Sequence, residues 1–127
     1  AVCAALDAGA DSIEHGAYLS RDTLRRLAAS ETVWVPTLST IADLIGCGRY
    51  PDEVLHRLLA GQQEAVVFAA AQGAAIGCGS DAGAYRVFHG KGTQDEHALL
   101  AEALGERAPQ LLAYAQGQIE RKFRFYG

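Results

Sequence analysis

The fold is decided by the stretch Ile76-Gly77-Cys78-Gly79-Ser80-Asp81-Ala82-Gly83. The apolar run over residues 74–76 predicts the end of a buried strand. The glycines that follow allow a sharp turn, so that one carboxylate, Asp81, stands at the carboxyl end of that strand. Parallel α/β sheets and barrels bind their ligands at this end of the strands, which makes Asp81 a candidate for chemistry.

Two further strands are predicted ahead of this stretch. Residues 11–15 predict a short strand ending at His15, and residues 33–35 a buried strand that Pro36 closes, because proline cannot continue a central ladder. Glycine, proline and capping signals predict helices over residues 2–8, 20–29, 51–73, 93–105 and 109–123, with one helical turn near residues 41–45. Strands that alternate with helices predict parallel pairing through right-handed crossovers, so we expect an α/β fold, as an open sheet or a barrel.

Two details are expected in the C-terminal helices. The run Thr93-Gln94-Asp95-Glu96 fits a capping box, in which Glu96 reaches back to the start of its own helix. Gly117 is expected to interrupt the last helix, because glycine weakens helix interiors.

The composition fits a single domain over residues 1–127, of which 50% are hydrophobic. A net charge of −4 with scattered Lys and Arg disfavours nucleic-acid binding. Three cysteines without C-x-x-C spacing are typical of reduced thiols in a cytoplasmic protein. The longest apolar run, residues 65–71, is shorter than the about 20 residues that span a bilayer. Because the sequence starts at Ala1 in a predicted helix and contains no methionine, we expect a fragment of a longer protein.

His15 and Asp81 are the sharpest pair of candidate site residues. They follow two strands predicted to be parallel, so both side chains are expected at one edge, where they can converge on one metal ion or one water. The simpler interpretation of each residue stays open. His15 can hydrogen-bond a neighbouring loop, and Asp81 can cap its own turn.

Other candidates lie close to the strand ends. Thr37 follows the second strand, where its hydroxyl can contact a substrate or cap the next turn. Tyr85, Arg86 and His89 follow Asp81, and the Arg86 guanidinium can bind a substrate carboxylate or lie free on the surface. The remaining histidines, His56 and His97, fall on predicted exposed helix positions and are expected to be structural.

Three blocks in order carry a resemblance to a known family. Residues 9–16, 35–38 and 76–83 together resemble the C-terminal part of the metal-dependent amidohydrolases, in particular the branch with imidazolonepropionase-like and dipeptide-cleaving members. The resemblance implies strands six to eight of a (β/α)₈ barrel, here incomplete, and a mono- or binuclear metal centre that is usually zinc. By that resemblance His15 is the sixth-strand ligand. Asp81 is the eighth-strand aspartate, which binds metal and handles the proton of the attacking water.

The function implied by the resemblance is hydrolysis of C–N bonds in a small-molecule amide, cyclic amide or dipeptide. A divalent ion lowers the pKa of its bound water toward about 7 and polarises the substrate carbonyl. Asp81 then takes the proton of that water and passes it to the leaving nitrogen. The family's H-x-H pair, bridging lysine or glutamate and fifth-strand histidine have no counterpart here, and its T-P-x-E-A-L pattern is not recognisable after Asp81. We therefore expect the 127-residue chain alone to be inactive.

Two other interpretations stay open. The pattern Gly77-x-Gly79-x-x-Ala82 also fits the G-x-G-x-x-G/A motif of dinucleotide-binding units, although Asp81 would then point a negative charge at a pyrophosphate. The chain can also be a non-catalytic α/β fragment or interaction module. Its exposed strand edges would then favour association with further copies of itself.

Overall fold

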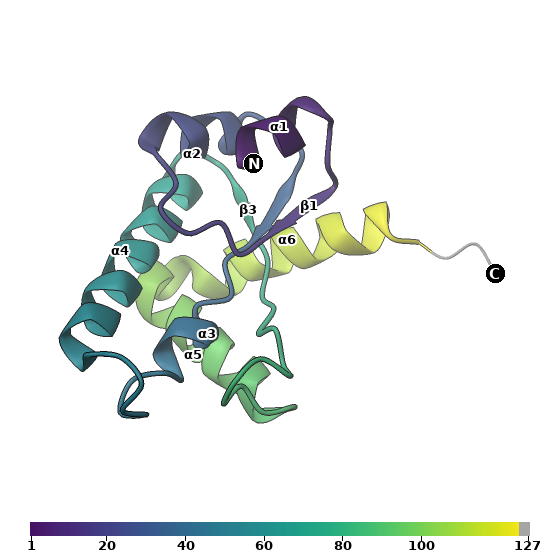
Figure 1. Cartoon of the computed structure of the whole chain (residues 1–127). Helices are drawn as coiled ribbons and strands as arrows, with labels where there is room; N and C mark the ends of the chain where they lie inside the picture. The colour runs from purple at the N-terminus through teal and green to yellow at the C-terminus, as the bar shows by residue number, and fades with distance from the viewer. Residues whose placement is uncertain (125–127) are drawn as a thin grey trace.

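The computed structural model describes residues 1–124. Along the chain the elements are α1 (Val2–Asp7), β1 (Ser12–Glu14), α2 (Arg21–Ala28), β2 (Val33–Val35), α3 (Ser39–Ala42), α4 (Asp52–Ala71), β3 (Ala75–Ile76), α5 (Lys91–Leu104), the 3₁₀ helix η1 (Gly105–Arg107) and α6 (Ala108–Lys122). Helices surround a small central sheet, and α6 leads toward the C-terminus (Figure 1). Within this part of the chain no helix is long and apolar enough to cross a membrane.

The sheet has the strand order β1-β2-β3, and both pairs are parallel. Ile13 pairs with Trp34, and Trp34 pairs with Ile76. The predicted α/β class and parallel pairing are therefore confirmed. The carboxyl ends of the strands point toward α3 and toward the loop that leads into α5 (Figure 1).

The two faces of the sheet are covered by different helices. Ile13, Trp34 and Ile76 face a large apolar cluster with residues of α2 and α4. The opposite face is covered by α6, where Ala115 packs on Val33 and Ala75. The described chain is therefore a three-layer α/β/α arrangement, in which the crossover helices α2 and α4 share one side.

Close packing against β2 leaves little room for side chains at the glycines that follow β3. Neither Gly77 nor Gly79 has a positive φ. A Cβ on Gly77 would lie 3.0 Å from Cγ2 of Val35, and a Cβ on Gly79 would lie 2.7 Å from Cγ1 of Val35. The loop therefore runs directly against β2. Positive φ values are found further on, 57° at Asp81 and 111° at Gly83.

Local signals predicted several boundaries correctly. Ser20 caps α2, because its side chain accepts a hydrogen bond from Thr23 N at 3.2 Å, and α4 begins directly after Pro51. Two predictions about the C-terminal helices are wrong. Helix α5 begins at Lys91 and Glu96 bonds to another segment, so the capping box does not form, and α6 continues through Gly117. A long-range contact of Glu96 replaces the local one.

Candidate active site at the strand ends

The three strand ends share an uncommon backbone conformation. His15 directly follows β1, Thr37 lies two residues after β2, and Asp81 lies five residues after β3. Their φ values are 65°, 52° and 57°. This left-handed region is disfavoured for residues other than glycine, most of all for a β-branched one such as Thr37. Each such residue costs on the order of 1–3 kcal/mol, and strain of this kind clusters at active sites and ligand clamps.

Two backbone hydrogen bonds hold His15 in place. Its amide donates to Val35 O at 2.9 Å, and its carbonyl accepts from Nε1 of Trp34 at 2.7 Å. Trp34 is fully buried. Gly16 is required next, since its φ is 76° and a Cβ there would lie 3.3 Å from Trp34 Nε1. The backbone conformation at His15 is thus held by hydrogen bonds to β2, including one from the buried Trp34.

The His15 ring is oriented by Thr37. His15 Nδ1 and Thr37 Oγ1 are 2.8 Å apart, and the Thr37 hydroxyl donates to Pro36 O at 2.8 Å. A hydroxyl has a single proton, so the donor in the His15–Thr37 bond is Nδ1–H. The lone pair of neutral His15 therefore lies on Nε2. A ligand or proton-accepting histidine has this arrangement, with one nitrogen held by a neighbour and the other free.

Glu96 is the residue that the sequence analysis missed. Its side chain is fully buried, and its two carboxylate oxygens accept from Leu38 N at 3.0 Å and Ser39 N at 2.7 Å. Burial raises the pKa of Glu96 above its ordinary value, and the two backbone donors oppose that rise. A signal was present, because Glu96 lies four residues from both Gly92 and Leu100, on the buried face of α5.

Ser39 connects the second strand end to the third. Its Oγ donates to Ser80 O at 3.1 Å, directly before Asp81. Glu96 therefore supports the segment after Thr37 and, through Ser39, the segment that carries Asp81. We call these residues the strand-end network, made up of His15, Thr37, Leu38, Ser39, Ser80, Asp81 and Glu96.

Asp81 itself is exposed, and its carboxylate forms no hydrogen bond with any residue in 1–124. Its backbone carbonyl accepts from Ala84 N at 3.0 Å. The turn is therefore closed by the main chain, and the Asp81 side chain is left available.

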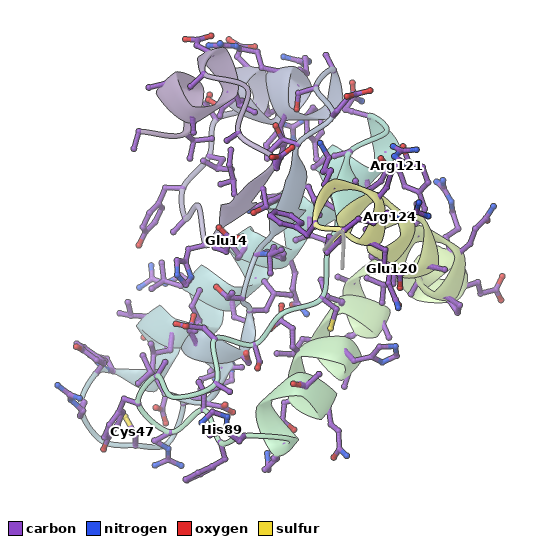
Figure 2. All side chains as sticks on the ribbon, turned by 90° about the vertical axis from the view of Figure 1, so that its right-hand side faces the viewer. Glu14, Cys47, His89, Glu120, Arg121 and Arg124 are labelled. Carbon is purple, nitrogen blue, oxygen red and sulfur yellow. The ribbon has the colours of Figure 1, made fainter. Side chains whose placement is uncertain are left out.

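The structure does not group the remaining candidates with His15. The Arg49 guanidinium lies 4.8 Å from the centroid of the Tyr85 ring. Burial and the nearby Asp95 raise the pKa of the Asp43 carboxyl above its ordinary value. Arg86 lies close enough to Asp43 to oppose that rise. His89 is exposed and lies at the same end of the molecule as Cys47, away from Glu14 of β1 (Figure 2). The contacts of Tyr85 and Arg86 thus run to the segment after α3.

The donor set for a metal ion is partial. His15 Nε2 and the Asp81 carboxylate are suitable zinc donors. Within residues 1–124, no group of three or more His, Cys, Asp and Glu side chains is arranged to hold a metal ion. A complete zinc shell needs at least one more protein ligand.

The dinucleotide-binding interpretation is not supported by the loop after β3. In that motif the glycines open a helix whose N-terminus meets the pyrophosphate. Here residues 77–90 contain no helix, and α5 begins only at Lys91. Instead, Gly77 and Gly79 allow the loop to pack closely against the Val35 side chain.

Comparisons with known proteins give relatives of unassigned activity. The chain is 34% identical over 116 residues to uncharacterized proteins of Mycobacterium bovis and of Mycobacterium tuberculosis strains CDC 1551 and H37Rv. The match covers 87% of this chain and 30% of each relative, so the chain spans about a third of the length of the curated relatives that it matches. No protein-family model matches the chain. No solved structure matches it either.

Proposed function

We propose that this chain is part of a metal-dependent hydrolase that cleaves C–N bonds of small molecules, with zinc as the expected metal. The observation that carries the proposal is the His15–Thr37 hydrogen bond of 2.8 Å, which leaves the lone pair on His15 Nε2 at a strand end. The matched relatives are about three times as long as the matched segment, so a protein of that length has room for the missing ligands.

In this proposal each residue of the strand-end network has a separate task. His15 supplies a neutral ligand through Nε2, and Thr37 holds its ring. A divalent ion held there would lower the pKa of a nearby water molecule. Asp81, whose carboxylate is exposed and without a protein partner in residues 1–124, would take up a proton at that carboxylate and pass it to the leaving nitrogen. Glu96 holds the segments that carry Thr37 and Asp81.

The proposal assigns β1, β2 and β3 to strands six to eight of a (β/α)₈ barrel. In such barrels the crossover helices lie outside the strands. Helices α2 and α4 lie on the Trp34 face, so the opposite face, with Val33 and Ala75, would point inward. That face is covered here by α6. In a complete barrel α6 would have to pack elsewhere.

The packing of α6 on this face of the sheet favours a second candidate function. With Ala115 of α6 packed on Val33 and Ala75, both faces of the sheet are buried within the chain itself. A non-catalytic α/β unit would show this arrangement too. The two candidates differ in whether His15 binds metal.

Zinc titration of the chain, followed by NMR of the imidazole nitrogens, tests the proposal. Zinc is expected to shift the His15 Nε2 signal, and Thr37→Val should weaken zinc binding about 10- to 100-fold because the ring loses its partner. His56→Gln is the matched control, since His56 is exposed on α4. Equal affinity in wild type, Thr37→Val and His15→Gln would contradict the proposal.

Turnover is tested in the longer protein that contains this segment. There Asp81→Asn should abolish hydrolysis of small amides while zinc content is retained to within about twofold, because other ligands hold the ion. Asn also accepts the left-handed backbone of residue 81, so the variant keeps the turn. Full hydrolytic activity in Asp81→Asn would overturn the role of Asp81.

A further inference from the structure

We propose that the cleft between the β1–α2 loop, α3 and α4 binds a small carboxylate with an apolar body. The cleft has a volume of about 300 Å³ and is distinct from the strand-end network, none of whose residues line it. This site requires no metal and does not rest on the proposed hydrolase activity.

The walls of the cleft are mostly apolar. Leu19 of the β1–α2 loop, Ile41 of α3, and Leu58 and Ala65 of α4 form them. Small-molecule sites range upward from about 300 Å³ and combine apolar walls with a few polar groups. The cleft is at the small end of that range, so its size favours a compact ligand over a peptide.

Gln62 is the first polar group of the cleft. The residue is only 6% exposed, and its amide makes no hydrogen bond with any residue in 1–124. No side-chain nitrogen or oxygen in the described residues is both sealed from solvent and unpartnered, so the Gln62 amide reaches solvent, and Gln62 lines the cleft. Because the polar atoms of the amide are not sealed from solvent, water can bond to them when no ligand is bound. A polar ligand group in the cleft would replace that water with a direct hydrogen-bond partner.

Arg57 supplies charge at the same cleft. Its ion pair with Glu53 measures 3.7 Å, with both side chains well exposed, so the guanidinium is weakly held and free to turn to a ligand. A guanidinium binds a carboxylate through two parallel N–H donors. The Gln62 amide offers a further N–H donor. A carboxylate on an apolar body therefore matches both polar groups and the walls.

Phenylacetate is a suitable probe, with phenylacetamide as its uncharged counterpart. Titrations of the chain are followed through the backbone amide NMR signals of residues 57–65. We expect phenylacetate to bind with a Kd of about 1 mM or tighter, and phenylacetamide about tenfold more weakly. Arg57→Gln should reduce phenylacetate binding about tenfold and leave phenylacetamide binding nearly unchanged, because only the carboxylate uses the charge. Gln62→Leu should weaken both probes about fivefold.

Gly61→Leu keeps the test independent of folding. Gly61 lies in α4 and lines the cleft, and a Cβ there meets no atom within 4 Å, so a leucine can start from this position without a clash at its Cβ and occupy part of the cleft. Leucine is also a better helix former than glycine, so the fold should be retained. Gly117→Leu on α6 is the matched control, since its Cβ also meets nothing within 4 Å.

The expected result is loss of phenylacetate binding in Gly61→Leu and unchanged binding in Gly117→Leu. The proposal is overturned if neither probe binds the wild type. It is also overturned if wild type binds both probes equally, or if Gly61→Leu binds phenylacetate as well as wild type does.

Discussion

The ends of β1 and β3 both place a reactive side chain on a left-handed backbone, and they hold it in different ways. At the first end, the amide, the carbonyl and the ring of His15 all bond to residues 34–37. At the third end, only the backbone of Asp81 is bonded, and its carboxylate is exposed. The first side chain is oriented before any ligand arrives, whereas the second can rotate.

The difference matches two chemical tasks. A metal ligand acts best when its geometry and tautomer are fixed in advance, since reorientation reduces affinity. A group that accepts a proton at one atom and delivers it to another needs some rotational freedom. The contrast between His15 and Asp81 thus supports their separate roles in the proposal.

Replacement of Glu96, which supports both strand ends, should have the largest effect on the free energy of unfolding. Glu96→Leu leaves the amides of Leu38 and Ser39 buried without acceptors. Each buried N–H without a partner costs about 1–3 kcal/mol, so we expect a loss of about 4 kcal/mol in the free energy of unfolding. Glu96→Gln keeps one acceptor and should cost about half as much. Urea denaturation followed by circular dichroism measures both variants.

The control and a pH signature sharpen this result. Glu102→Gln, at an exposed position of the same helix, should change stability by less than about 0.5 kcal/mol. Because burial raises the pKa of Glu96 above 4.5, the folded state holds that proton more tightly than the unfolded state. Its contribution is therefore complete below pH 4.5 and is lost as pH rises through the raised pKa. The difference in free energy of unfolding between wild type and Glu96→Gln should therefore decrease as pH rises through the raised pKa of Glu96. An increase in this difference with pH would contradict the raised pKa.

A change at Trp34 should affect the end of β1 more than the end of β3, because the indole N–H bonds directly to His15 O. Trp34→Phe removes the donor to His15 O and leaves a small cavity in the core, at a cost of about 2–3 kcal/mol. We expect faster hydrogen exchange at the His15 amide and unchanged exchange at Ala84, whose amide bonds to Asp81 O. Trp34 is the only tryptophan, so unfolding is followed by circular dichroism. Equal acceleration at both amides would show that the ends are not independent.

Most of the fold could be predicted from sequence because its signals are local. Pro36 closes β2, Ser20 caps α2, and the alternation of strands and helices predicted the parallel sheet. Each of these signals acts within a few residues of its effect. The pairing of His15 with Thr37 followed less directly, since sequence placed both at one edge but offered two interpretations of each side chain.

The missed features depend on distant contacts. Glu96 bonds to amides that lie 57 and 58 residues away, and a capping box is an equally good local use for the same side chain. The sequence predicts an interruption of α6 at Gly117, but Ala115 before it and Ile119 after it both pack in the cluster with Val33 and Ala75. Tertiary burial outweighs a glycine penalty of about 1 kcal/mol.

The smallest effect separates backbone strain from side-chain bonding at the two ends. His15→Gly and Asp81→Gly both relieve a positive φ, by about 1 kcal/mol relative to the matching alanine variants. Relative to wild type, His15→Gly also loses the bond to Thr37 and should be near neutral or slightly destabilised. Asp81→Gly loses no side-chain bond in residues 1–124 and should therefore be stabilised by up to about 1 kcal/mol. Thermal and urea unfolding of the four variants measure the difference, and a destabilised Asp81→Gly would mean that the Asp81 carboxylate is held as firmly as the His15 ring.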